Sequence, residues 1–401
     1  MIEKINSYID SKNKNILFCF FALLAIAIRM LCSLRGHSLD FETLDMSATA
    51  ALKGENFYTE IPKISNYAPI GYFILGGIKS LCFNFRYEMS LFLSLIDVLI
   101  AFLVFTRKNY FASLFFLFSP ISIIISGYHC QIDNLAILFA LLAVFYVGRN
   151  KKIENMSIKE TFVFSAIIGL SLVTKHIFIF FPIWMFFKTN KINQKLIFII
   201  VPFSMFLLSF VPFLPNGGYE SIKQNVFNYP SFNNAPFYNA FINSTLINKI
   251  ISLINMTEFA PRLFFFVAVI ICGICFRKRN IFESFLFYLL CIFVFSSAIT
   301  NQYLVIPLLF TAFYPNIYSI LFNIWGLLFL TFDWCELHYT FASKSFNQKI
   351  TDMIIDRYGY GYYIFVLLLL FSLIHALYKN EIKQLIKNCY NECLEAIKFK
   401  N

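Results

Sequence analysis

Residues 16–34, ILFCFFALLAIAIRMLCSL, decide the fold class of this 401-residue chain. The run is apolar apart from Arg29 and one serine, it follows a short basic segment, and nothing like a small-residue cleavage site comes after it. About 20 apolar residues in a helix are enough to cross the hydrocarbon layer of a bilayer. We therefore interpret this segment as a retained first transmembrane helix.

The rest of the chain has the same character. It is 59% hydrophobic and 19% aromatic, with 53 Phe, and only 14% charged, whereas about a quarter of a soluble protein is charged. This composition excludes a soluble enzyme, a coiled coil, a disordered tail protein and a disulfide-stapled secreted domain. We expect an all-α polytopic membrane protein, a single integral membrane domain over residues 1–401 with about 12 transmembrane helices. The expected spans are 16–34, 89–106, 109–126, 133–149, 161–175, 177–187, 195–213, 259–276, 281–298, 303–315, 317–332 and 359–378.

The distribution of basic residues orients these spans. Segments expected inside, including a cytoplasmic basic tail at 379–401, hold 20 Lys or Arg, against 12 in the segments expected outside. The two long outer loops are 35–88 and 214–258. Counting Pro69–Phe83 as a span would invert everything after it, so we expect an interfacial helix there. The net charge of +11 is then an orientation signal, and it requires no nucleic acid partner.

Ionisable residues inside spans are costly and point to function. Arg29 lies close to the outer end of the first span, where its guanidinium either snorkels to the interface or binds an anion such as a phosphate. Asp97 lies mid-span, as a partner for Arg29 or as a hydrogen-bonding group in the helix bundle.

Four polar groups fall at the outer ends of spans. Asp40 and Glu42 follow the first span, where two carboxylates can hold a divalent cation or supply a general base, or can be the acidic first turn of a capped helix. The adjacent Lys175 and His176 would suit a phosphate at the interface. The other two groups are His129, Gln131 and Asp133, of which Asp133 could simply cap the next helix, and Asn301, Gln302 and Tyr303.

These motifs resemble the GT-C family of polyprenyl-phosphate-sugar-dependent glycosyltransferases, including the dolichol-linked glucosyltransferases of N-glycan assembly and the first mannosyltransferase of GPI assembly. The likeness covers roughly residues 25–310, and the last hundred residues match nothing that can be quoted. It rests on Asp40-Phe41-Glu42 after a first span, Asn66-Tyr67-Ala68-Pro69-Ile70, Ser119-Pro120 before His129-x-Gln131-x-Asp133, Lys175 after a span, and Gln302-Tyr303. Ala68 and His176 stand where the family often has Pro, which leaves subfamily and sugar open.

The resemblance implies a GT-C-like fold, with interfacial helices in the first outer loop, and an inverting transfer of a hexose, glucose or mannose, to a lipid-linked glycan or glycolipid acceptor. Asp40 would be the general base and Glu42 would orient Asp40 or the acceptor. The resemblance implies no cofactor, with a divalent metal as the less favoured possibility. The residues expected to bind the donor phosphate or substrate are Arg29, Tyr67, His129, Gln131, Asp133, Lys175, His176 and Gln302.

Three different functions remain open. A transporter or flippase of lipid-linked sugars would suit a multi-span chain, but transporters gather polar groups at the bilayer midplane, and here they gather at one outer edge. A polysaccharide polymerase or a non-catalytic assembly subunit would also fit a chain with many spans and long outer loops. The richness in Lys, Asn, Ile and Phe is typical of an AT-rich genome and favours a bacterial inner membrane, with the active site facing the periplasm and surface polysaccharide as the product.

Overall fold

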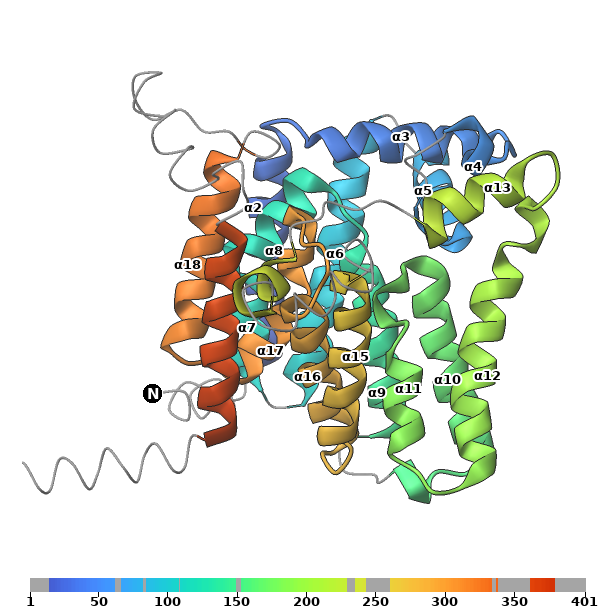
Figure 1. The fold of residues 1–401 in the computed structure, drawn as a ribbon. Helices are drawn as coiled ribbons and strands as arrows, with labels where there is room; N and C mark the ends of the chain where they lie inside the picture. The colour runs from blue at the N-terminus through green and yellow to red at the C-terminus, as the bar shows by residue number, and fades with distance from the viewer. Residues whose placement is uncertain are drawn as a thin grey trace, which may run out of the picture.

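The apolar runs of the sequence are helices in the computed structural model of the chain (Figure 1). The structure describes residues 14–61, 66–81, 84–107, 109–148, 153–228, 235–242, 260–333, 337 and 361–378, and no strand occurs among them. The predicted tail at 379–401 lies outside these residues, as does much of the predicted loop 214–258.

Four helices are long and apolar enough to cross a membrane by themselves. They are α2 (Lys14–Ser33), α6 (Phe85–Thr106), α12 (Ile192–Ser209) with η4 (Val211–Phe213), and the helix Gly361–Tyr378. This confirms an all-α, membrane-embedded protein.

The expected span 109–126 is instead two helices, α7 (Tyr110–Leu117) and α8 (Pro120–Ile124). The second continues into the π-helix η1 (Ile125–His129), and the pair is bent by 46°. Pro120 has no N–H to continue the first helix, and Ser119 caps the second through its side chain. The break between α7 and α8 therefore falls just before Pro120.

The remaining apolar helices are shorter. Each of the other expected spans contains helix, but the count of about 12 crossings stays a prediction because these helices fall below the length of a full span. They are α9 (Asp133–Val147), α10 (Ile158–Thr174), η3 (His176–Phe178) with α11 (Phe181–Phe187), α15 (Ala260–Cys275), α16 (Ile281–Val294), η7 (Asn301–Val305) with α17 (Leu308–Phe313), and α18 (Ile317–Phe332).

Segments expected outside gather at one end of the bundle. Figure 1 shows α3 (Leu39–Leu52) lying across that end, with α4 (Phe57–Glu60), α5 (Pro69–Ser80) and α13 (Gly218–Ile222) beside it. At 12 residues, α5 is too short to cross a bilayer.

Segments expected inside contact one another at the opposite end. Gln194 donates to the carbonyl of Met156 at 2.8 Å, and Lys188 donates to that of Arg279 at 2.6 Å.

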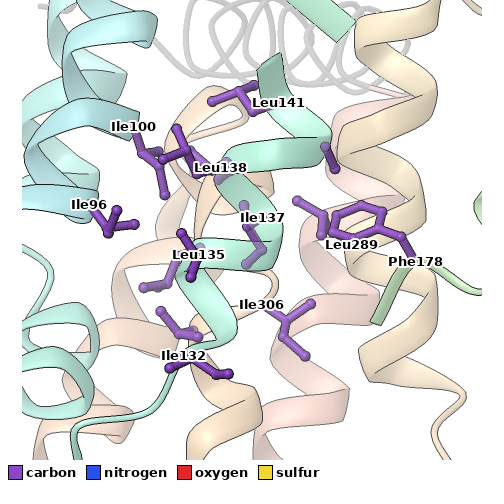
Figure 2. Close-up of a cluster of buried hydrophobic side chains, with 14 of the residues drawn as sticks. Ile96, Ile100, Ile132, Leu135, Ile137, Leu138, Leu141, Phe178, Leu289 and Ile306 are labelled. Carbon is purple, nitrogen blue, oxygen red and sulfur yellow. The ribbon is translucent and has the colours of Figure 1, made fainter. Parts of the chain in front are cut away.

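The hydrophobic core is centred on α9. Figure 2 shows Leu135, Ile137, Leu138 and Leu141 of this helix packed among side chains of other helices, which are Ile96 and Ile100 of α6, Phe178 of η3, Leu289 of α16, and Ile306. A helix that is apolar on all sides is buried on all sides, and α9 is buried along nearly its whole length. Its first residues, Asp133 and Asn134, are therefore held rigidly where the core meets the end of the bundle that carries α3.

Candidate functional site

The start of α3 places Asp40 against the η1 helix. Ser38 is the N-cap residue, in an extended conformation, and its buried hydroxyl donates to the carbonyl of His129 at 3.3 Å. Asp40 lies in the first turn, and its Oδ2 accepts a hydrogen bond from His129 Nε2 at 3.0 Å. Two predicted site residues, 89 positions apart in the sequence, are thus in direct contact.

His129 owes its position to an irregular segment. It ends the π-helix η1, and Cys130 follows in the left-handed conformation at φ 59°. Gly127 lets η1 approach α2, because a Cβ atom there would lie 2.7 Å from the carbonyl oxygen of Arg29. A π-helical turn at this point is typical of functional sites, and it orients the imidazole of His129 toward α3.

The Asp40–His129 pair is asymmetric in exposure. The side chain of His129 is 4% exposed and that of Asp40 is 54% exposed, so the carboxylate is the member that meets solvent. The hydrogen bond from His129 is the largest influence on the carboxyl group. It lowers the pKa of Asp40 below its usual value, burial acts in the opposite direction, and the charges of His129 and Lys175 lower it further. Asp40 is therefore an ionised, accessible carboxylate at neutral pH.

A second group of predicted residues lies beside this pair. Lys175 Nζ donates to Asp133 Oδ2 at 2.6 Å, and both side chains are almost fully buried. The same Nζ lies 3.4 Å from the hydroxyl of Tyr67 and 4.5 Å from the centre of its ring. Tyr67 in turn donates to Gln131 Oε1 at 2.6 Å. Four of the residues predicted to bind substrate form one connected network.

Tyr67 is held in this network by its neighbours. The backbone carbonyl of Tyr67 accepts a hydrogen bond from the hydroxyl of Tyr58 at 2.7 Å, and its backbone N–H donates to the hydroxyl of Tyr72 at 3.0 Å. Gly71 lets α5 approach the end of α10, since a Cβ atom there would lie 2.7 Å from the carbonyl oxygen of Thr174. Burial, followed by the negative charges of Asp133 and Asp40, raises the pKa of Tyr67 well above its usual value. The phenol stays protonated and donates.

Two buried acceptors at the site have no hydrogen-bond partner among the described residues. They are Oδ1 of Asp133 and Oε1 of Gln302. Gln302 lies on η7, which packs against η1 and α9, and the neighbouring Tyr303 has its ring 5.8 Å from Lys175 Nζ. An unsatisfied buried acceptor costs free energy, and hydroxyl groups of a ligand would be suitable donors to both.

Arg29 does not snorkel to the interface, and its expected role in binding the donor phosphate stays a prediction. Its side chain is fully buried, with Nε donating to Asp97 Oδ2 at 3.0 Å and the rest of the guanidinium bonded to Ser122 Oγ at 2.8 Å and to the carbonyls of Ala25 and Leu117. Asp97 also accepts from Ser122, Ser126 and Asn134. The pair forms a structural network inside the bundle, in which Asp97 is both the partner of Arg29 and a hydrogen-bonding group.

Glu42 does not join Asp40. The two acidic residues occupy the first turn of α3, but positions two apart on a helix point to different faces. Glu42 is exposed and has no hydrogen bond to Asp40. His176 is partly exposed, and its Nδ1 is buried without a partner among the described residues. The described residues contain no group of three His, Cys, Asp or Glu arranged to hold a metal ion.

Sequence reasoning identified Asn301 at the start of η7 but missed the two residues that bond to it. Asn301 donates to Asp333 Oδ2 at 2.6 Å and accepts from the hydroxyl of Tyr362 at 2.6 Å. Asp333 and Tyr362 belong to the last hundred residues, where no motif is recognisable. Asp333 directly follows a long apolar run, and an acidic residue at a span boundary is the one signal that could have found it.

Comparison with protein-family models, curated proteins and solved structures gives no match to this chain.

Proposed function

We propose that the protein is an inverting glycosyltransferase that moves a hexose, glucose or mannose, from a polyprenyl-phosphate carrier to a lipid-linked glycan or glycolipid acceptor. The observation that carries the proposal is the convergence of Asp40, Tyr67, His129 and Lys175, from four separate segments, on one end of a membrane-embedded bundle. Such an end is where a carrier lipid presents its phosphate and sugar.

In the proposed reaction, Asp40 Oδ accepts the proton of the acceptor hydroxyl as that oxygen bonds to the anomeric carbon. The bond from this carbon to the phosphate oxygen breaks, and its electron pair leaves with the carrier phosphate. Asp40 suits the role of base because it is ionised and exposed, while His129 behind it fixes its orientation. A lowered pKa makes a weaker base, so rapid transfer also needs stabilisation of the leaving group.

Lys175 supplies the positive charge for that stabilisation. Its ammonium lies among the rings of Tyr67 and Tyr303 and already acts on the charge of Asp40. In the ligand-free protein it is paired with Asp133. A carrier phosphate would share the ammonium with that carboxylate, while Gln131 and Tyr67 provide neutral hydrogen-bonding groups nearby.

We place this reaction on the periplasmic face of a bacterial inner membrane. The orientation follows from the sequence, in which segments expected inside hold 20 Lys or Arg against 12 in those expected outside. The bacterial membrane follows from the richness of the chain in Lys, Asn, Ile and Phe.

One observation favours a transporter of lipid-linked sugars as the second candidate. The bundle contains a broken helix pair, α7 and α8, and a buried Arg29–Asp97 ion pair, and transporters use both features at their midplane sites. Against this, both side chains of the pair are almost fully buried and are not accessible to a substrate.

A transfer assay in detergent separates the two functions. Purified protein is mixed with radiolabelled polyprenyl-phosphate glucose or mannose and a panel of synthetic lipid-linked mono- and disaccharides, with no membrane and hence no gradient. The proposal predicts a new glycosidic bond and stoichiometric release of polyprenyl phosphate. Two results together would establish transport instead: no product from either donor in this assay, and movement of the donor across the bilayer when the protein is reconstituted in vesicles.

A further inference from the structure

A second polar site lies on the other side of α3 from Asp40. It is an open pocket of about 460 Å³ between the start of α3, the end of α5 and the start of α6. The register of α3 separates it from the candidate active site, because Asp40 contacts His129 whereas the buried ring of Phe41 packs on Phe85, 5.4 Å between centres. The pocket is lined by His37, Phe41, Asp45, Lys79, Asn84, Phe85 and Arg86.

The lining of this pocket carries more positive than negative charge. Lys79 and Arg86 face one carboxylate, that of Asp45, which accepts from Lys79 Nζ at 2.6 Å. Thr49 Oγ1 accepts from the same ammonium at 2.7 Å, so Lys79 is fixed in place. An anion entering the pocket would therefore meet a preorganised ammonium and a guanidinium together.

Arg86 uses little of its hydrogen-bonding capacity. Its guanidinium stacks on the ring of Tyr87 at 4.6 Å and donates to the hydroxyl of the same tyrosine at 2.6 Å. Its Nε is buried without a hydrogen-bond partner among the described residues. A planar fork of N–H groups is suited to two oxygens of one phosphate, so a phosphate would supply what Arg86 lacks.

A further donor borders the same space, beside the imidazole of His37, whose Nδ1 already donates to the carbonyl of Ser38 at 3.0 Å. Asn84 uses its Oδ1 to accept from the backbone N–H of Arg86, and its amide nitrogen remains a donor. The pocket thus offers several donors around one acceptor carboxylate, the composition that a multi-oxygen anion requires.

The position of the pocket indicates where that anion comes from. Phe85 and Arg86 begin α6, one of the four long apolar helices, so the pocket lies where such a helix leaves the hydrocarbon. Leu39 and Met46 of α3, close in sequence to the lining residues Phe41 and Asp45, are more than half exposed, as lipid-facing side chains are. Phosphate groups of lipids occupy that depth.

We propose that this pocket binds the phosphate of a membrane lipid, with Arg86 and Lys79 as its cationic ligands. The site is separate from the candidate active site, and the proposal does not depend on glycosyl transfer. Its occupant would anchor α3 and α5 at the membrane surface. Asp40 lies on α3, and α5 begins shortly after Tyr67.

The test measures binding of defined phosphates to the full chain in neutral phosphatidylcholine nanodiscs. The probes are phosphatidylglycerol, farnesyl phosphate and inorganic phosphate, with native mass spectrometry as the readout. We expect both lipid phosphates to bind, and Arg86→Gln and Lys79→Gln each to weaken binding about tenfold or more. Arg86→Lys keeps the charge but loses the fork, so it should bind at an intermediate level.

Lys53→Gln is the matched control, since it removes one positive charge from an exposed residue of the same loop outside the pocket. It should bind lipid phosphates like the wild type. Circular dichroism and thermal unfolding verify that each variant is folded. Equal binding of phosphatidylglycerol by wild type and a folded Arg86→Gln would overturn the proposal. Binding of inorganic phosphate as tight as that of phosphatidylglycerol would overturn the assignment to a lipid.

Discussion

The buried Arg29–Asp97 pair makes a prediction about stability whose sign depends on which partner is removed. Asp97 accepts hydrogen bonds from Arg29, Ser122, Ser126 and Asn134, and both charged side chains are inaccessible to water. In Asp97→Asn the shape is kept but the charge of Arg29 loses its counter-charge. Removing one partner of a buried pair costs about 3–5 kcal/mol of stability. Because the amide oxygen of Asn still accepts some of these bonds, we expect the free energy of unfolding to fall by about 3 kcal/mol.

Arg29→Met alone should also destabilise the protein, since it leaves the carboxylate of Asp97 buried and uncompensated. The double variant Arg29→Met/Asp97→Asn leaves no unpaired charge at this position, so it should be more stable than either single variant. Arg107→Met is the matched control, because Arg107 is exposed and its removal should change stability by less than about 1 kcal/mol.

Unfolding in mixed micelles of increasing SDS content gives the free energies for this cycle. Variants should also be compared for binding of a polyprenyl-phosphate sugar per folded molecule, which a structural role leaves unchanged. The reasoning fails if the double variant is no more stable than Asp97→Asn. A folded Arg29→Met that loses donor binding would restore Arg29 to the substrate site.

Three further predictions concern the site and its support. Lys175→Met should raise KM for the donor about 10- to 100-fold, from loss of a charge-assisted contact of about 1.5–3 kcal/mol; an unchanged KM in folded protein would remove Lys175 from the phosphate site. The hydrogen bond from His129 lowers the pKa of Asp40 below 3.8. The carboxylate therefore stays ionised, and its pairing with His129 keeps stabilising the fold, until the pH falls below 3.8. His129→Gln should shift the acid limb of kcat/KM to higher pH, and an unmoved limb would argue against the pair. Gly71→Ala places a methyl group 2.7 Å from the carbonyl oxygen of Thr174 and should cost about 1–3 kcal/mol of stability. Gly77→Ala, in open space on the same helix, should instead stabilise by about 0.5–1 kcal/mol; similar thermal shifts for both would contradict the packing of α5 on α10.

The sequence was most informative about the ends of helices. Asp40, His129, Asp133 and Lys175 each follow or precede an apolar run, and a consistent topology puts those boundaries on one side. Residues on one side of a bundle can meet, and the structure brings these four together in two pairs, Asp40 with His129 and Asp133 with Lys175. Which pairs would form, and that Tyr67 would link Lys175 to Gln131, depends on the approach of α5 to α10, which no single segment specifies.

The failures have physical causes as well. Position along a span says nothing about the side of the helix, so sequence reasoning leaves open whether Arg29 binds a phosphate, snorkels or pairs with Asp97, and the structure shows the pairing. Of the alternatives for Asp40 and Glu42, the structure shows the acidic first turn of a helix, which rotates the two carboxylates about 200° apart. Asp333 and Tyr362 reach the site region only through tertiary packing against Asn301.

The most direct test of the central claim is single-turnover transfer by Asp40→Asn. The substitution keeps the shape of the side chain and its contact with His129, and it removes only the basic carboxylate. Glu220→Gln is the control, a carboxylate-to-amide change at an exposed residue of α13 at the same end of the bundle. With polyprenyl-phosphate glucose or mannose bound, we predict that Asp40→Asn transfers about 10²–10⁴-fold more slowly while donor affinity and thermal stability are retained, and that Glu220→Gln behaves like the wild type. Transfer by Asp40→Asn at the wild-type rate would contradict the account.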